Sequence, residues 1–159
     1  MTASSLPGTV GNDAGNGTVG NDAGITDIEQ IRRLTHEYAG NLDGGLLDEL
    51  VSLFTDDGVW DGSGWGIPAI QGTKALREFF AATMASNAGT CHLTSNHIIT
   101  IDGNSAACTA YFHAFGRRLD GSLNDSLGIY TDELVRTAQG WKFSRRSVRG
   151  MLTPPAAGS

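Results

Sequence analysis

The sequence changes its hydrophobic period once, near residue 91, and this change limits the folds that the chain can adopt. Before it, large apolar residues recur every three or four positions, as they do in amphipathic helices. After it come four stretches rich in β-branched and aromatic residues, at 92–101, 105–118, 127–137 and 141–149. Helices at one end of a chain and consecutive strands at the other predict an α+β fold, with the helices on one face of an antiparallel sheet.

Three helices are expected before the change. Thr26 followed by Glu29 is a capping box, and the apolar residues after it predict a helix that ends near residues 40–41. A second, short helix is expected after the turn at 43–45, with Leu47, Leu50, Val51 and Phe54 on its buried face, and Thr73 is expected to cap a third. A long, strongly curved sheet that is covered by only three helices leaves a hollow, which is where a small-molecule pocket would form.

The two ends of the chain differ from its middle. Residues 8–15 and 17–24 are the same eight letters, and they contain too few large apolar groups to offset the entropy lost on ordering. A calcium-binding glycine and aspartate repeat is the alternative, but two copies cannot stack into a stable solenoid. We therefore expect a flexible arm over 1–24, one folded domain over 25–150 and a loose tail over 151–159.

Composition and charge argue against several classes of protein. The 17 acidic and 11 basic residues give a net charge of -6 without a long run of one sign, which argues against nucleic acid as a partner. There is no apolar run of membrane-spanning length and no basic, apolar leader, so we expect no membrane contact and a cytoplasmic protein. Cys91 and Cys108 are too few for a disulfide framework and stand in no metal-ligand spacing, so we expect reduced thiols on half-buried strand residues and no metal.

Polar and aromatic side chains mix on the faces of the first two long strands. His92 and Asn96 share a face of one strand, and Tyr111, His113 and Phe115 share a face of the next. A pocket for a small molecule needs such a mixture, because apolar walls supply affinity while sparse polar groups fix orientation.

The turn at 102–104 decides whether His92 and His113 lie on the same face. In a hairpin with a two-residue loop, the numbers of two paired residues add up to an odd number. The numbers 92 and 113 also do, so both rings would lie on one face, whereas a three-residue loop or a bulge separates them. The sequence leaves both outcomes open. His97 is expected to alternate away from His92, and His36 to lie on the solvated face of the first helix.

Three stretches carry a resemblance to a known family. From about residue 25 to 149 the chain resembles the SnoaL-like branch of the NTF2-like superfamily, and within it the scytalone dehydratases and the hexachlorocyclohexane dehydrochlorinases. The matching residues are Tyr38 with Asn41, Leu42, Asp43, Leu53 and Phe54; Cys91, His92 and Asn96; and Tyr130, Thr131, Asp132, Glu133, Arg136, Trp141, Lys142, Phe143, Ser144 and Arg146.

The resemblance implies a cone-shaped α+β fold, no metal or organic cofactor, and a homodimer or homotrimer. It also implies that His92 removes a carbon-bound proton while Asp43 orients its ring, and that Arg136 lines the pocket near the leaving group. Further candidates for contact with the substrate are Tyr38, Trp60, Trp65, Tyr130 and Asp132.

The chemistry expected of this pair is general-base catalysis. A carboxylate on one ring nitrogen fixes the tautomer and stabilises the imidazolium that forms when the other nitrogen accepts a proton. Departing negative charge also needs donors. The candidates for this role are Tyr38, Tyr111, His113 and Arg136.

We therefore expect a cofactor-independent lyase, a dehydratase or related eliminase, that acts on a small hydrophobic or aromatic molecule. An isomerase, a polyketide cyclase or an epoxide hydrolase in the same pocket remains open. So does a non-catalytic ligand-binding or assembly module, such as a relative of the small subunit of ring-hydroxylating dioxygenases.

Simpler interpretations exist for several of these residues. Asp43 would also suit a plain turn, His92 could be a strand histidine bonded to a backbone carbonyl, and Trp60 and Trp65 could be core residues. The basic stretch at 145–149 is most simply an edge or an oligomer contact.

Overall fold

A computed structural model describes residues 26–151, so the expected N-terminal arm and most of the expected tail lie outside the described residues. In chain order the elements are α1 (Asp27–Gly44), α2 (Leu47–Ser52), β1 (Phe54–Asp61), the 3-10 turn η1 (Ser63–Trp65), β2 (Ile70–Gln71), α3 (Thr73–Ala85), β3 (Asn87–Asp102), β4 (Ser105–Arg118), β5 (Leu123–Thr137) and β6 (Gly140–Gly150). Among the described helices, none combines the length and the apolar character that crossing a bilayer requires.

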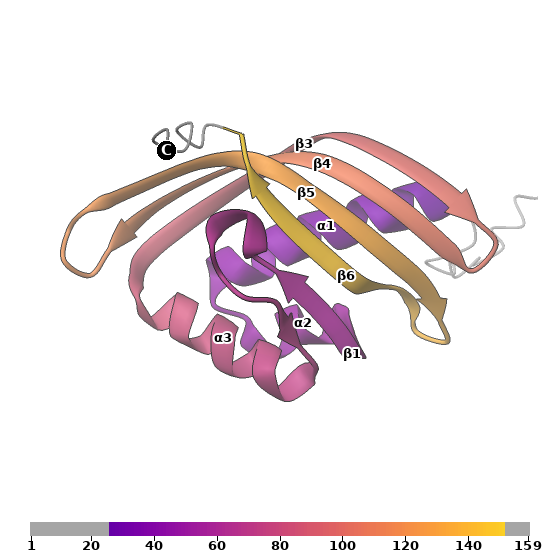
Figure 1. Ribbon diagram of the computed structural model, residues 1–159, viewed down its shortest axis with the longest axis horizontal. Coiled ribbons are helices and arrows are strands. Elements are labelled where there is room, and N and C mark those ends of the chain that lie inside the picture. Colours follow the sequence, from indigo (N-terminus) through magenta and orange to yellow (C-terminus); the bar gives the residue numbers. More distant parts are fainter. Residues whose placement is uncertain (1–25, 152–159) are drawn as a thin grey trace, which may run out of the picture.

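The strands form one curved sheet in the order β2-β1-β6-β5-β4-β3. Strands β3 to β6 are the expected antiparallel meander, while β1 joins β6 in parallel. The helices all lie beneath the concave face of the arch (Figure 1). The expected α+β cone is confirmed. The expectation that Phe54 belongs to the second helix is wrong, because Phe54 faces the core from the start of β1.

Helix α1 runs past its expected end and includes Asp43. Its start is as expected, since Thr26 accepts a hydrogen bond from the Glu29 amide. Gly45 caps its end, because a φ of 69° lets the Gly45 amide bond to the carbonyls of Asn41 and Leu42. Asp43 therefore lies in the last turn of a helix and not in a loop.

A bulge in β3 decides which side chains face the concavity. The hairpin loop has two residues, since Asp102 pairs with Ser105, but between Ser95 and Ile98 the register with β4 shifts by one. Asn96 adopts a φ of 55° at this point, a conformation that asparagine tolerates better than most residues. Alternation therefore changes phase at the bulge, and His92 pairs with Ala114 while His113 pairs with Leu93.

His97 faces inward as a result, which corrects the expectation that it alternates away from His92. Its Nε2 lies 2.7 Å from the hydroxyl oxygen of Thr35, a residue with no exposed surface on α1. His36 is exposed, as expected, although its ring lies edge-on to His97 at 5.3 Å.

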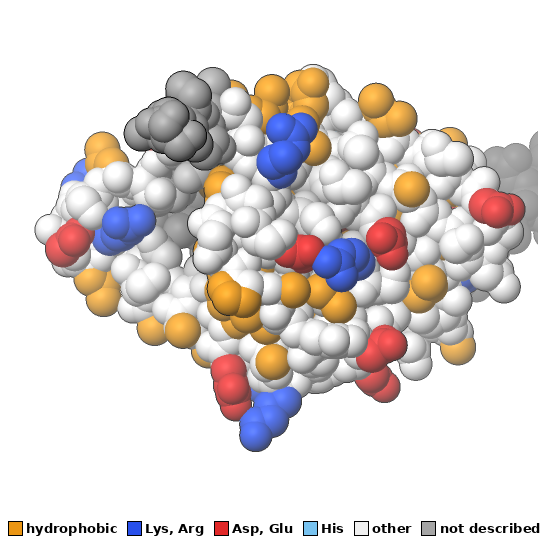
Figure 2. Space-filling view, viewed as in Figure 1, with side chains coloured by type: hydrophobic (Ala, Val, Ile, Leu, Met, Phe, Trp, Pro, Cys, Tyr) orange, Lys and Arg blue, Asp and Glu red, His pale blue; other side chains and the backbone are white. Residues whose placement is uncertain are grey.

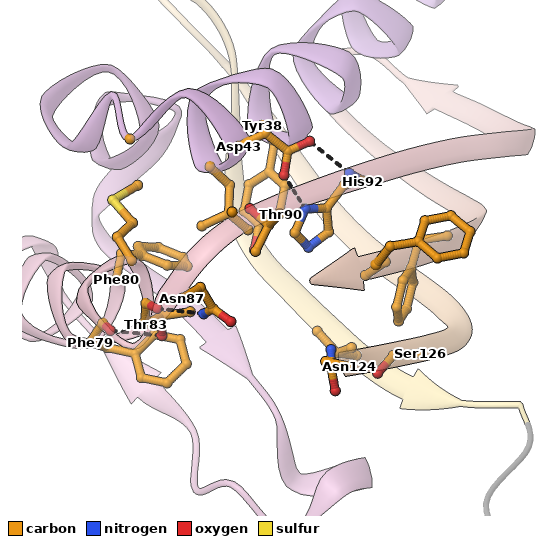
Figure 3. A pocket seen from close by; sticks show the side chains of 18 of the residues that line it. Tyr38, Asp43, Phe79, Phe80, Thr83, Asn87, Thr90, His92, Asn124 and Ser126 are labelled. Carbon is orange, nitrogen blue, oxygen red and sulfur yellow. Dashed lines mark hydrogen bonds and ion pairs between the residues drawn. The ribbon is translucent and has the colours of Figure 1, made fainter. Parts of the chain in front are cut away.

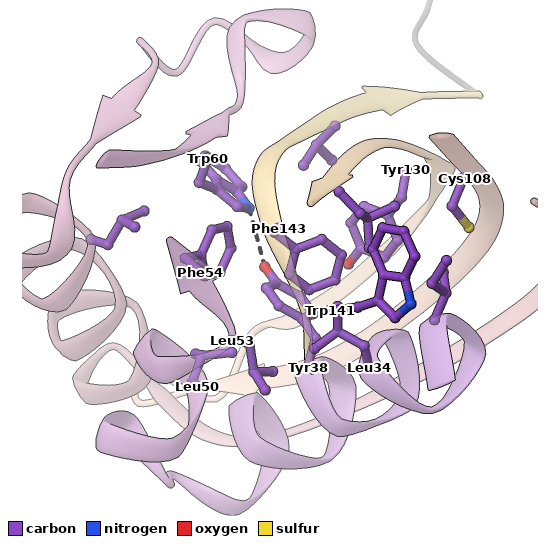
Figure 4. Packing of buried hydrophobic residues seen from close by; sticks show 14 of the residues in the cluster. Leu34, Tyr38, Leu50, Leu53, Phe54, Trp60, Cys108, Tyr130, Trp141 and Phe143 are labelled. Carbon is purple, nitrogen blue, oxygen red and sulfur yellow. Dashed lines mark hydrogen bonds between the residues drawn. The ribbon is translucent and has the colours of Figure 1, made fainter. Parts of the chain in front are cut away.

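The core is an aromatic cluster between α1, α3 and the concave face of the sheet. Tyr38 lies at its centre, and its ring makes edge contacts with the rings of Phe54, Phe80, Tyr130 and Phe143 (Figure 4). Within residues 26–151, no helix lies over the opposite face of the sheet, and Leu93, Ile98 and Tyr111 are exposed there by 41 to 71%. The expected homo-oligomer stays a prediction.

Charged side chains are scattered over the surface. On the face shown in Figure 2, acidic and basic groups lie singly or in small groups of mixed sign, and no broad basic patch appears. This face offers no footprint for a phosphate backbone.

The bulge predicts an unusual response to substitution at position 96. Asn96→Gly should leave the free energy of unfolding unchanged or raise it, whereas Asn96→Val should lower it by about 1–2 kcal/mol because a β-branched residue resists positive φ. Urea unfolding measures both, and Ser95→Val at the neighbouring exposed position should stay within about 0.5 kcal/mol. Equal losses for both valine variants would contradict this explanation.

His97 predicts part of the pH dependence of stability. Burial, helped by the positive charges of His36 and Arg32, lowers the pKa of His97 from its ordinary value of 6.5. The unfolded chain then binds more protons than the native state in the window below 6.5, so stability should fall as the pH falls through that window.

The Thr35 hydroxyl donates its proton to the Arg32 carbonyl, so in the contact with His97 it is the Nε2–H of His97 that donates to the Thr35 oxygen. A glutamine amide can make the same donation. His97→Gln should therefore weaken the decline in melting temperature between pH 7 and pH 5. An identical decline in both proteins would rule out this contribution.

Candidate active site

A cavity of about 420 Å³ opens between α1, α3, the loop after β1 and the concave face of β3 to β5. Its walls are mainly apolar and include Trp60, Trp65, Phe79, Phe80 and Phe112. The volume is in the range of sites that enclose a small organic molecule. Trp60 and Trp65 therefore line the cavity, as the sequence suggested, and so does Phe115.

Asp43 and His92 meet at the wall of this cavity. The ring Nδ1 of His92 lies 2.5 Å from Oδ1 of Asp43, and the backbone amide of His92 donates to Oδ2 at 2.6 Å (Figure 3). The side chains are only 13% and 22% exposed. Because the carboxylate accepts at Nδ1, we place the proton there, which leaves Nε2 as an acceptor. Figure 3 shows that nitrogen directed away from Asp43, toward the cavity.

The position of Asp43 is unfavourable for the helix by itself. A carboxylate in the last turn lies at the negative end of the helix dipole, where cations are favoured. The two hydrogen bonds from His92 offset this cost, and both the carboxylate and the helix end would stabilise an imidazolium at His92. A local conflict of this kind is expected at a functional site.

Two phenols face the same cavity. Tyr38, from α1, and Tyr130, from β5, both line it, although each residue is at most 4% exposed. The Tyr38 oxygen accepts a hydrogen bond of 3.1 Å from the indole N–H of Trp60. Burial raises the pKa of Tyr38 to about 12, so its hydroxyl is protonated at neutral pH and can act as a donor.

Asp132 lies behind the cavity wall and not in it. Its two carboxylate oxygens accept parallel hydrogen bonds of 2.8 Å from Nε and Nη2 of Arg146, and the side chains of the pair have no exposed surface. This corrects two expectations, since Asp132 cannot touch a substrate and Arg146 is no edge contact. A bulge at Ser144 turns Arg146 inward, directly opposite Asp132.

Four other candidate residues lie outside the cavity lining. Asn96 is exposed in the bulge, and Tyr111 and His113 face the convex side of the sheet. His113 instead contacts Asp125 at 2.6 Å near the surface. Arg136 forms an ion pair with Asp27 and lies over the ring of Trp141, at the other end of α1 from Asp43. The structure therefore places none of these four candidates in the lining of the cavity.

The sequence reasoning missed several polar groups that do line the cavity. These are Thr83 near the end of α3, Asn87 and Thr90 on β3, and Asn124 and Ser126 on β5. Asn124 and Ser126 alternate in phase with Tyr130, so the period of β5 could have revealed them. Asn87 could not be found in this way, because it lies at a helix-to-strand junction.

Both cysteines are free thiols, although Cys91 is exposed and Cys108 buried instead of both being half-buried. Over residues 26–151, no three His, Cys, Asp or Glu side chains come together in a way that could hold a metal ion.

Comparison with known proteins places the sequence in a family. The sequence model of the SnoaL-like domain matches residues 23–147. No curated protein matches the chain significantly.

Solved structures share the fold. One, from Novosphingobium aromaticivorans and provisionally named an aromatic ring hydroxylase, is 31% identical with a TM-score of 0.78 and covers 80% of this chain and 90% of its own. A provisionally named scytalone dehydratase from the same species is 24% identical, with a TM-score of 0.74 and coverage of 84% and 89%. A type 2 hexachlorocyclohexane dehydrochlorinase is 20% identical, with a TM-score of 0.71 and coverage of 82% and 88%.

The double hydrogen bond of Asp43 predicts a measurable change in His92. Asp43→Ala should lower the free energy of unfolding by about 1–3 kcal/mol, because the His92 amide loses its acceptor in a partly buried place. Asp43→Asn should let the ring change tautomer, which ¹⁵N NMR of the imidazole would detect. Asp48→Asn, which alters an exposed acid on α2, should do neither. An unchanged His92 tautomer in Asp43→Asn would contradict the orienting role of Asp43.

Proposed function

Because the chain belongs to the SnoaL-like family, we propose that it is a cofactor-independent lyase in which His92, oriented by Asp43, removes a proton from carbon. The observation that carries this proposal is the His92–Asp43 contact at the wall of a mainly apolar cavity. The substrate that fits is a small hydrophobic or aromatic molecule with one acidic C–H bond. Dehydration and the loss of a halide are both compatible with this pair.

The chemistry requires a proton acceptor, a carboxylate and hydrogen-bond donors in one place. Nε2 of His92 accepts the proton, Asp43 stabilises the resulting imidazolium, and the hydroxyls of Tyr38 and Tyr130 can donate hydrogen bonds to negative charge that forms on the substrate. The apolar walls exclude water and strengthen these interactions. An isomerase or a cyclase would begin with the same proton abstraction, so the proposal concerns that first step most directly.

A non-catalytic assembly module is the second candidate. It is favoured by the 31% identity to a protein provisionally named an aromatic ring hydroxylase, since a subunit of such an enzyme could use this fold for association. We prefer the lyase because an assembly module has no use for a His–Asp pair that faces a cavity. An epoxide hydrolase is less favoured. That reaction would need an Asp-Arg-Asp set on the strands to activate water, but Asp132 is bonded to Arg146 behind the cavity wall and Arg136 is paired with Asp27 outside the cavity.

Exchange of carbon-bound hydrogen for deuterium tests whether His92 removes a proton from carbon. A panel of candidate compounds takes the place of a single chosen substrate. The protein is incubated in D₂O with cyclic and aryl ketones, β-hydroxy ketones and chlorinated cyclohexanes, and ¹H NMR follows the loss of C–H signals and the appearance of alkenes. We expect one class to exchange or eliminate, and His92→Gln to slow that reaction by about 10²–10⁴-fold.

The second His–Asp pair provides a matched control. His113→Gln removes a histidine that is also bonded to an aspartate but lies on the convex face, so it should leave the rate unchanged. Equal rates in wild type and His92→Gln would sink the proposal. Ligand binding without exchange or elimination across the whole panel would favour the non-catalytic module.

A further inference from the structure

A second side-chain hydrogen bond joins α1 to β3, and the reaction proposed above does not use it. Nε2–H of His97 donates to the hydroxyl oxygen of Thr35 at 2.7 Å, near the middle of the helix. Thr35 has no exposed surface, and neither residue is part of the cavity lining. The bond therefore fastens the helix to the strand at a place where no ligand in the cavity touches it.

Histidine is an unfavourable residue at position 97. The next residue on the same face of β3, Ile99, is apolar and packs against the core. Burial, helped by the neighbouring positive charges of His36 and Arg32, lowers the pKa of His97, so the ring is uncharged at pH 7. An apolar side chain would fit these surroundings without that conflict. A polar residue that opposes its own environment in this way indicates a role other than stability.

The bulge at Asn96 allows two histidines of β3 to reach the same helix. Positions 92 and 97 are an odd number apart, and in a regular strand an odd separation puts two side chains on opposite faces. The extra residue of the bulge brings His97 to the face of His92. As a result, β3 contacts α1 through one histidine on each side of the bulge.

Asp27, Thr35 and Asp43 each bind the sheet from α1 through a side-chain hydrogen bond, and they recur every eight residues. Eight residues of helix span about 12 Å, so Thr35 fixes the helix close to Asp43, whereas Asp27 lies about 24 Å from it. Helix α1 packs along β3 over this distance (Figure 1). Because a short stretch of helix is stiff, a displacement at Thr35 also displaces Asp43.

The contact between Asp43 and His92 is sensitive to such a displacement. Its two hydrogen bonds are 2.5 and 2.6 Å long, and hydrogen bonds weaken once the two atoms separate beyond about 3.2 Å. A misplacement of about 1 Å is also enough to slow catalysis about 10²-fold. A contact outside the cavity is therefore able to control the geometry inside it.

We propose that His97 is a positioning residue for the candidate active site: its hydrogen bond to Thr35 fixes α1 against β3 and thereby holds Asp43 on the ring of His92. His97 touches no substrate in this arrangement. The inference rests on the proposed role of His92, and it adds what keeps that ring in the tautomer whose Nε2 accepts a proton.

The tautomer of His92 tests the proposal without a substrate. ¹⁵N NMR of the imidazole rings distinguishes a proton on Nδ1, where Asp43 holds it, from a proton on Nε2. Thr35→Val removes the hydroxyl at nearly constant volume. It should shift the ratio of the two tautomers about three- to tenfold toward Nε2–H, which is the equilibrium value of one ordinary hydrogen bond. An unchanged ratio in Thr35→Val would overturn the proposal.

A paired variant separates positioning from stability. Thr35→Val combined with His97→Leu leaves no donor without an acceptor, so its melting temperature should equal or exceed that of the wild type. The tautomer ratio should still shift, because the helix has lost its polar contact with the strand. Thr35→Ser keeps the hydroxyl and His97→Gln keeps an N–H donor, so both should retain most of the wild-type ratio. If the paired variant shows the wild-type ratio, packing alone holds α1 and the proposal is wrong.

Asp27→Ala is the matched control on the same helix. It removes the ion pair with Arg136 and the hydrogen bond from Trp141 at the start of α1. The tautomer ratio of His92 should not change, because Thr35 still fastens the helix between Asp27 and Asp43. Equal shifts in Asp27→Ala and Thr35→Val would mean that any loosening of α1 disturbs His92, which contradicts a specific role of His97.

Turnover provides a second measurement with any compound that reacts in the deuterium panel. Thr35→Val should lower kcat about tenfold or more and leave KM nearly unchanged, because the lining of the cavity is intact. A change in KM alone would count against the proposal. Failure of the lyase proposal is distinguishable, since it appears as equal deuterium exchange in wild type and His92→Gln, whereas the tautomer ratios still report whether His97 positions the ring.

Discussion

Asp43 joins the last turn of α1 to β3 through two short hydrogen bonds to one residue, His92. One bond fixes the backbone of the strand and the other fixes the ring, so a single carboxylate sets both where the helix ends against the sheet and which ring nitrogen faces the cavity. The carboxylate is unfavourable at the end of its own helix and becomes favourable only through this partner. The fold and the candidate chemistry therefore depend on the same contact.

Two bulges give the concave face its chemical character. The bulge at Asn96 turns His92 into the cavity and brings His97 against Thr35, while His113, on the regular strand β4, stays on the convex side. The bulge at Ser144 turns Arg146 into the core opposite Asp132. Each bulge adds one residue to one strand, and one residue is enough to exchange the faces of every side chain beyond it. Bulges near functional sites commonly redirect side chains in this way.

Charge in the interior is arranged around the aromatic cluster. Tyr38 and Tyr130 stand between the cavity and the guanidinium of Arg146, and the His92–Asp43 pair lines the same cavity. An apolar wall interrupted by a proton acceptor and by two phenolic donors suits a ligand that becomes negatively charged during reaction.

The sequence by itself determined the order of helices and strands, the four-stranded meander and the resemblance that pairs His92 with Asp43, because caps and hydrophobic periods are local and the matching motifs are short. Asn124 and Ser126 lie in the part of β5 before the strand expected at 127–137, so alternation places them on the face of Tyr130 only once the observed start of the strand at Leu123 is known. Tertiary structure alone decided that His113, Tyr111 and Arg136 lie outside the cavity and that Arg146 lies within the core. For His113, Tyr111 and Arg146 the physical reason is that a bulge is a one-residue change in the pairing between two strands, and neither strand encodes that pairing by its own sequence. Arg136 is excluded because its part of β5 lies at the other end of α1 from Asp43.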